Sequence, residues 1–263
     1  MVNQALYQTA IGNLLWFAIT TRPDIIYAVN VVAQFQQNPT SMAWNATKRI
    51  MKYLVKTSAM GITIDPRDMQ LSVYSDANHG DAALGDRLSV SGGAYYLGES
   101  LIHWTCRKQR TPAHSSAESE LIAASDTAHE ALWLHHVGED IGVINGIVMF
   151  IDNKAAVDIA NAKGLTRRVK HIEIRDAFIR VMQERGTITI QQIPSLENRA
   201  DVFTKAFGSP ATYVHARDTA LRPLDCESAG ECYDVAKRIT SSGDVAERIT
   251  SSSDQPDVNG RFA

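Results

Sequence analysis

The sequence has few of the features that mark secreted and membrane proteins. It holds only three cysteines in 263 residues, Cys106, Cys226 and Cys232. An odd and scattered set argues against a disulfide scaffold and fits a reducing compartment. No apolar run approaches the roughly 20 residues of a membrane span, and the N-terminus lacks the basic start and apolar stretch of a secretory signal. We therefore expect an intracellular protein, cytoplasmic or nuclear, that is not secreted and has no membrane partner.

A strong excess of charge of either sign is also missing. The formal net charge is −3, and the 44% hydrophobic and 21% charged residues are ordinary for a globular chain of one or two domains. The average hides an uneven distribution, because residues 225–263 carry eight acids and four bases. The other 224 residues carry 22 bases and 21 acids, and residues 163–185 hold seven bases against three acids. The net charge therefore does not exclude a nucleic-acid partner.

The chain divides into three regions that differ in composition and in the spacing of their apolar residues. Residues 1–66 have apolar residues at helical spacing over 11–18, 25–35 and 41–56, which predicts three helices. Pro23 separates the first two, because proline is tolerated only in a first helical turn. Residues 224–263 contain a nearly perfect ten-residue tandem repeat with few apolar side chains. We expect a low-complexity, disordered acidic tail there, with a helical interaction segment as the alternative.

Residues 67–210 alternate between strand and helix patterns. The expected strands cover 71–75, 92–97, 100–105, 147–151 and 187–193, and the expected helices cover 116–136, 153–162, 172–184 and a last one that opens near residue 198 or 199. This order predicts an α/β domain with a mixed β-sheet flanked by helices.

Four acids of this middle region stand at the boundaries of the expected elements: Asp76, Glu120, Asp152 and Asp201. Like charges brought together raise one another's pKa, so such a cluster is costly unless a cation offsets it. Oxygen ligands alone favour Mg²⁺ or Mn²⁺ over zinc. The alternative is that each acid is only a helix cap or a solvated turn residue, and the acids by themselves do not decide between the two.

The sequence motifs around these acids are more specific than the acids alone. The stretches that carry them are Tyr74-Ser-Asp-Ala-Asn78, Asp86-Arg-Leu-Ser-Val-Ser-Gly92, Trp104, Lys108-Gln109, Ser115-Ser-Ala-Glu-Ser-Glu-Leu-Ile-Ala123, Asp152-Asn153, Lys170-His-Ile-Glu-Ile-Arg175 and Ala200-Asp-Val-Phe-Thr-Lys205. In this unbroken order, over about residues 71–207, they closely resemble the ribonuclease H domain of copia-type retrotransposon polyproteins. Residues 7–64 resemble the end of the reverse transcriptase that precedes this domain, through Ile11-Gly-Asn-Leu-Leu15, Thr21-Arg-Pro-Asp-Ile25 and Lys48-Arg-Ile-Met-Lys-Tyr-Leu54.

The resemblance implies a ribonuclease H-like fold and endonucleolytic cleavage of the RNA strand of an RNA–DNA hybrid. The metal-binding acids of the family fall on Asp76, Glu120, Asp152 and Asp201, and the family pattern selects Glu120 rather than Glu118. The implied cofactor is a pair of Mg²⁺ ions, with Mn²⁺ possible, roughly 3.5–4 Å apart. The implied partners are the hybrid and the rest of a reverse transcriptase.

A basic segment, made of the loop before the helix expected over 172–184 and the first turn of that helix, is expected to contact phosphates of the nucleic acid. Its candidate residues are Arg167, Arg168, Lys170, His171 and Arg175. The alternative for basic residues of this kind is a solvated helix face.

Three alternatives compete with ribonuclease H activity, and one of them keeps the fold with a different substrate, as in related exonucleases and integrases. DNA polymerisation is set aside, because no Tyr-x-Asp-Asp segment occurs in the chain. A catalytically inactive retroelement remnant that binds nucleic acid or protein stays open. His79, where the family usually has an aromatic residue, and the unfamiliar tail favour this alternative, whereas the intact acids count against it.

Overall fold

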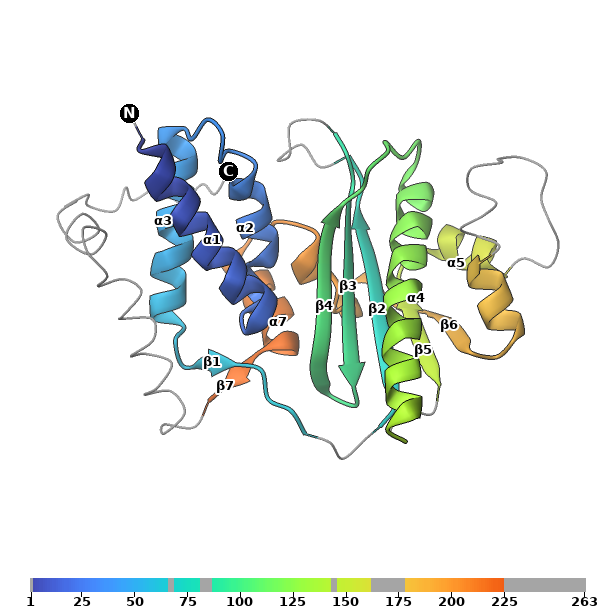
Figure 1. Cartoon of the computed structure of the whole chain (residues 1–263). Helices are drawn as coiled ribbons and strands as arrows, with labels where there is room; N and C mark the ends of the chain where they lie inside the picture. The colour runs from blue at the N-terminus through green and yellow to red at the C-terminus, as the bar shows by residue number, and fades with distance from the viewer. Residues whose placement is uncertain (1, 66–68, 81–86, 143–145, 162–177, 225–263) are drawn as a thin grey trace. The chain divides into compact units, whose positions relative to one another are not determined.

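The computed structural model describes residues 2–65, 69–80, 87–142, 146–161 and 178–224 (Figure 1). The chain forms two compact units: the larger spans Ile62–Ala206, and the smaller joins the residues up to Gly61 to those from Phe207 onward. The functional division into 1–66, 67–210 and 224–263 stays a prediction, and the predicted tail lies outside the described residues except for Leu224. Within the described ranges, no helix has both the length and the apolar character to cross a bilayer.

The larger unit is built on a five-stranded mixed sheet. Its strands are β2 (Leu71–Asn78), β3 (Val90–Leu97), β4 (Ser100–Lys108), β5 (Ile147–Ile151) and β6 (Ile188–Gln192). Their order is β4-β3-β2-β5-β6, with β2, β3 and β4 antiparallel, β5 parallel to β2 and β6 parallel to β5. The predicted ribonuclease H-like fold class is confirmed.

Helices cover one face of this sheet (Figure 1). They are α4 (Ser116–Asp140), α5 (Lys154–Asn161) and the helical residues 178–184. Helix α4 begins after a serine cap, because the Ser115 hydroxyl accepts the N–H of Glu118 at 3.1 Å. Buried alanines on α4, among them Ala124 and Ala128, let the helix pack closely on apolar side chains of the sheet. The first residues of the helix predicted over 172–184 lie outside the described residues.

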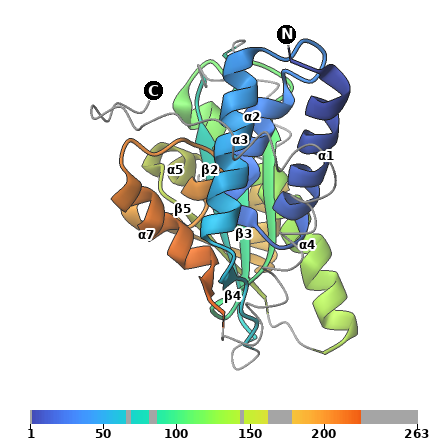
Figure 2. The ribbon, with the colours of Figure 1, turned by 90° about the vertical axis from the view of Figure 1, so that its left-hand side faces the viewer.

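The smaller unit is helical (Figure 2). Its elements are α1 (Gln4–Thr20), η1 (Pro23–Ile25), α2 (Ile26–Ala33), α3 (Ser41–Lys56) and α7 (Pro210–Ala220), with strand β1 (Met60–Gly61) paired antiparallel to β7 (Arg222–Pro223). The three helices predicted in residues 1–66 are confirmed. Some large apolar side chains stay on the surface, and Trp16 and Ile19 of α1 are 65% and 59% exposed.

A buried ion pair joins the parts of the smaller unit. Arg22 binds Asp24 with Nε at 3.0 Å and Nη2 at 2.8 Å. The hydroxyl of Tyr53 on α3 donates to the Asp24 carboxylate at 2.6 Å, and the hydroxyl of Tyr213 on α7 donates to the Asp24 carbonyl at 3.1 Å. The motif around Pro23 thus fixes α7, about 190 positions later in the chain, on the N-terminal helices.

Replacing Asp24 with alanine should destabilise the smaller unit strongly. The change leaves the buried guanidinium of Arg22 without its counter-charge, and breaking one partner of a buried pair costs about 3–5 kcal/mol. Urea unfolding of the full chain, followed by circular dichroism, measures the loss. The control is Asp218→Ala, which removes a half-exposed pair with Arg217 and should cost less than about 1 kcal/mol. Equal losses in the two variants would contradict the prediction.

Candidate metal centre

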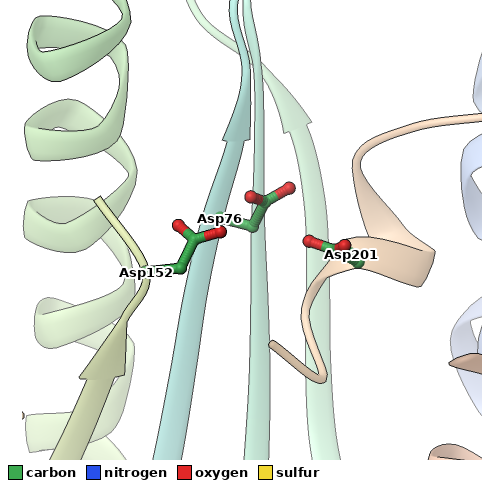
Figure 3. Close-up of side chains that lie close together, drawn as sticks. All are labelled: Asp76, Asp152 and Asp201. Atoms are coloured by element: carbon green, nitrogen blue, oxygen red, sulfur yellow. The ribbon is translucent and has the colours of Figure 1, made fainter. Parts of the chain in front are cut away.

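Two of the predicted acids meet because their strands are parallel neighbours. The pairing of β2 with β5 ends at Ser75 opposite Ile151, so the next residues, Asp76 and Asp152, lie side by side at the carboxyl end of the sheet. Asp201 reaches the same place from a separate turn, and Figure 3 shows the three carboxylates around one space. One carboxylate oxygen from each lies within 4.8 Å of the others.

The fourth acid comes from helix α4. Glu120 is 6% exposed, and burial, followed by the charges of Asp76 and Asp152, raises the pKa of its carboxyl to about 9. Glu118, the alternative, is partly exposed in the first turn of the helix, where its Oε2 accepts the N–H of His114 at 2.7 Å. Glu120 therefore lies buried beside the aspartate cluster, whereas Glu118 bonds to the backbone at the start of the helix.

The segment that carries Asp201 differs from the prediction. The expectation of a last helix opening near residue 198 or 199 is wrong: a 3-10 turn, η4, spans Asp201–Phe203, and the next α-helix begins at Pro210. The physical reason is the side chain of Asn198, whose Oδ1 accepts the N–H of Ala200 at 3.1 Å and so favours a tight turn.

The same asparagine ties this turn to the sheet. Asn198 is buried, and its Nδ2 donates to the carbonyl of Ser75 at 3.0 Å, one residue before Asp76. This contact spans 123 positions of the chain and holds the turn of Asp201 beside β2. Analysis of the sequence missed Asn198, although its place three residues before the acid was a usable signal.

A glycine on β3 makes room for the turn. Gly92 pairs with Asp76 across the sheet, and a Cβ built on it would lie 2.4 Å from Cγ2 of Thr204 and 3.2 Å from Cβ of Phe203. The turn can therefore sit against β3 only because this position has no side chain.

Two further residues of the turn contact the cluster, and analysis of the sequence assigned a role to neither. The buried hydroxyl of Thr204 donates to Oδ2 of Asp76. The ammonium of Lys205 lies 2.8 Å from Oδ1 of Asp201 and 3.6 Å from Oδ1 of Asp76.

These contacts offset only part of the electrostatic cost of the cluster. Burial raises the pKa of Asp76, with Lys205 and Thr204 opposing the shift. Burial and the charge of Asp76 raise the pKa of Asp201 to about 7, although Lys205 again opposes. The site thus keeps an unbalanced negative potential.

The donors fit a hard divalent cation. All four acids offer carboxylate oxygens, the ligands that Mg²⁺ and Mn²⁺ prefer. The buried Oε2 of Glu120 has no hydrogen-bond partner among the described residues, and a buried acceptor without a partner is costly unless a ligand satisfies it. The side chains that could hold metal are therefore Asp76, Glu120, Asp152 and Asp201.

A buried glutamine braces the helix that carries Glu120. Nε2 of Gln109 donates to the hydroxyl of Ser91 on β3 and to the carbonyl of Ser119, both at 2.9 Å. The start of α4 is thereby fixed to the sheet one residue before Glu120.

The predicted phosphate contacts lie outside the described residues. This holds for the whole set, Arg167, Arg168, Lys170, His171 and Arg175. Their role stays a prediction.

No family model matches the chain, but individual proteins do. It is 33% identical over 201 residues to the retrovirus-related Pol polyprotein from transposon TNT 1-94 of Nicotiana tabacum, a match that covers 76% of this chain and 15% of that polyprotein. It is 38% identical over 130 residues to the secreted RxLR effector protein 161 of Plasmopara viticola, which covers 49% of this chain and 90% of the effector. Among solved structures, LC11-RNase H1 isolated from compost matches with a TM-score of 0.40 and 14% identity, over 51% of this chain and 92% of that one.

Proposed function

Because the chain belongs to the retrovirus-related Pol polyproteins of transposons, we propose that its larger unit cleaves the RNA strand of RNA–DNA hybrids. The reaction is a metal-dependent, endonucleolytic hydrolysis. The observation that carries the proposal is the approach of Asp76, Asp152 and Asp201 to within 4.8 Å at the carboxyl end of parallel strands. The chain spans 15% of the tobacco polyprotein, so the proposal concerns this region alone.

The four acids would hold two divalent ions. Bound Mg²⁺ or Mn²⁺ would supply an activated water and would stabilise the leaving oxygen of the scissile phosphate. Asp76 is the central ligand in this proposal, because its carboxylate is coupled both to Glu120 and to Asp201. Asp152 and Glu120 would complete one side of the site and Asp201 the other.

Hybrid recognition would rest mainly on the backbone. The A-like hybrid exposes 2′-hydroxyl groups in a wide minor groove, which distinguishes an RNA strand from DNA. The basic residues Arg167, Arg168, Lys170, His171 and Arg175 would add phosphate contacts, which carry little sequence information. The exposed Trp16 and Ile19 of the smaller unit are suited to contact with the rest of a reverse transcriptase. The proposed setting is the cytoplasm or nucleus.

Hydrolysis of an end-labelled RNA–DNA hybrid tests the proposal. The wild-type chain should cleave the RNA strand with Mg²⁺ and not with EDTA. Asp76→Asn should retain less than about 1% of the rate, because it removes charge at the central ligand of a metal-dependent reaction. Asp218→Asn, on the half-exposed pair of the smaller unit, should cleave at the wild-type rate. Equal cleavage by wild type and Asp76→Asn, or cleavage by neither, rules out the proposal.

A second candidate is a binding module without activity. The observation that favours it is the match to the Plasmopara viticola effector. Part of this chain covers 90% of that effector, whose name describes a secreted protein and not a polyprotein. In that case the chain should bind the hybrid equally with and without Mg²⁺, with an affinity that falls steeply with salt. Fluorescence anisotropy of a labelled hybrid in EDTA, run beside the cleavage assay, separates the two candidates.

A further inference from the structure

A lysine occupies the position between two of the acids. Lys205 lies four residues after Asp201, and its ammonium is 2.8 Å from that carboxylate and 3.6 Å from Oδ1 of the buried Asp76. Among the described residues, Lys205 is the basic side chain that pairs with the cluster. The segment from Asp201 to Lys205 therefore carries both an acid and a basic side chain that pairs with it.

The contacts of Asp76 leave little room for a further cation. Its Oδ2 accepts the hydroxyl of Thr204, and its Oδ1 faces Lys205. A divalent ion shared by Asp76 and Asp201 would have to bind the same carboxylate oxygens that the ammonium of Lys205 faces. At the separations found inside a protein, an ammonium and a divalent ion repel one another strongly.

The side chain of Lys205 is able to leave. It is 36% exposed, and a lysine has a flexible four-carbon stem that can carry its ammonium into water. Thr204, by contrast, is buried and stays with the turn.

We propose that Lys205 is the resident cation of the metal-free site, and that a divalent ion must displace it to bind between Asp76 and Asp201. The inference rests on the proposed function for the identity of the site, but it concerns metal affinity and not catalysis. Lys205 holds the carboxylates together before metal arrives, and it lowers the affinity of the site for that metal. It is a positioning residue.

Calorimetric titration with Mn²⁺ tests the proposal on the full chain. Lys205→Met keeps the apolar stem and removes the charge, so it should bind Mn²⁺ about tenfold more tightly than wild type, since no ammonium has to be displaced. In EDTA the same variant should melt about 3 °C lower, because the acids have lost their counter-ion. Lys52→Met, on the exposed face of α3, makes the same change away from the site and should alter neither value.

Lys205→Arg keeps the test decisive if the methionine variant fails to fold. It retains the charge, so its Mn²⁺ affinity should equal or fall below that of wild type. An affinity that rises in Lys205→Arg, or that is unchanged or weaker in Lys205→Met, overturns the proposal, and so does an absence of Mn²⁺ binding in every variant. If wild type binds Mn²⁺ but leaves the hybrid intact, the proposed function fails, while the order of affinities still decides the role of Lys205.

Discussion

In the absence of metal, replacing Glu120 with glutamine should raise the melting temperature of the protein at pH 8. Burial and the neighbouring aspartates raise the pKa of this carboxyl to about 9, from its ordinary value of 4.5. The folded state therefore binds a proton more tightly than the unfolded state does, and stability falls as the pH rises from about 4.5 towards 9. Glutamine is neutral at every pH and avoids this loss.

The expected gain at pH 8 is on the order of 2 kcal/mol, or about 5 °C, after allowance for relaxation around the charge. Thermal melts in EDTA at pH 5 and pH 8 measure it, and the gain should shrink at pH 5, where the carboxyl is protonated in the folded state. Glu118→Gln is the matched control, because Glu118 is partly exposed in the first turn of α4 and bonds to the N–H of His114, so it should give no gain. If Glu120→Gln is no more stable than wild type at pH 8, the proposed electrostatic cost of the site is wrong.

The same variant should lose Mg²⁺-dependent hydrolysis of the hybrid. Glu120 lies within the coupled set of acids, and an amide is a weaker ligand for a hard cation than a carboxylate is. Acids that are held together for function reduce the stability of the fold. Replacing one of them is therefore expected to stabilise the fold and to remove activity.

Replacing Gly92 with alanine should prevent the site from assembling. The new Cβ would meet Cγ2 of Thr204 at 2.4 Å and the carbonyl oxygen of Ala200 at 3.3 Å, so the turn that carries Asp201 must move away from β3. Overpacking of this kind costs about 1–3 kcal/mol. Displacement by about 1 Å at a catalytic site lowers the rate about a hundredfold.

Mn²⁺ calorimetry and hybrid cleavage by Gly92→Ala measure this effect, together with a thermal melt. Gly12→Ala is the control, because Gly12 lies inside α1 and a Cβ there meets no atom within 4 Å. Alanine in a helix interior is favoured over glycine by roughly 0.5–1 kcal/mol, so this variant should be slightly more stable and fully active. Wild-type metal affinity in Gly92→Ala would show that the turn does not depend on the close approach.

Much of the fold follows from local patterns. Helix α3 begins at Ser41 and ends at Lys56, as its apolar spacing predicts, since a helix depends on its own periodicity and on a cap such as Thr40. Asp152 directly follows β5, as the pattern predicts. Asp76 was expected just after its strand, but β2 continues to Asn78 because its antiparallel pairing with β3 extends that far. The last α-helix begins at Pro210 and not near residue 198 or 199. The side chain of Asn198 accepts the N–H of Ala200 and so favours a turn, and its contact with Ser75, which the local pattern does not show, holds that turn on the sheet.

The sequence by itself determined the order of the elements, the family and the four candidate acids, because periodicity, capping and motif spacing are properties of neighbouring residues. Only the tertiary structure decided how the site is held. Glu120 owes its raised pKa to burial beside Asp76 and Asp152, and Asp201 reaches the cluster because Gly92 leaves room for its turn. Lys205 becomes the counter-ion of acids from two separate segments. These relations join residues from separate segments of the chain, and packing alone brings them together.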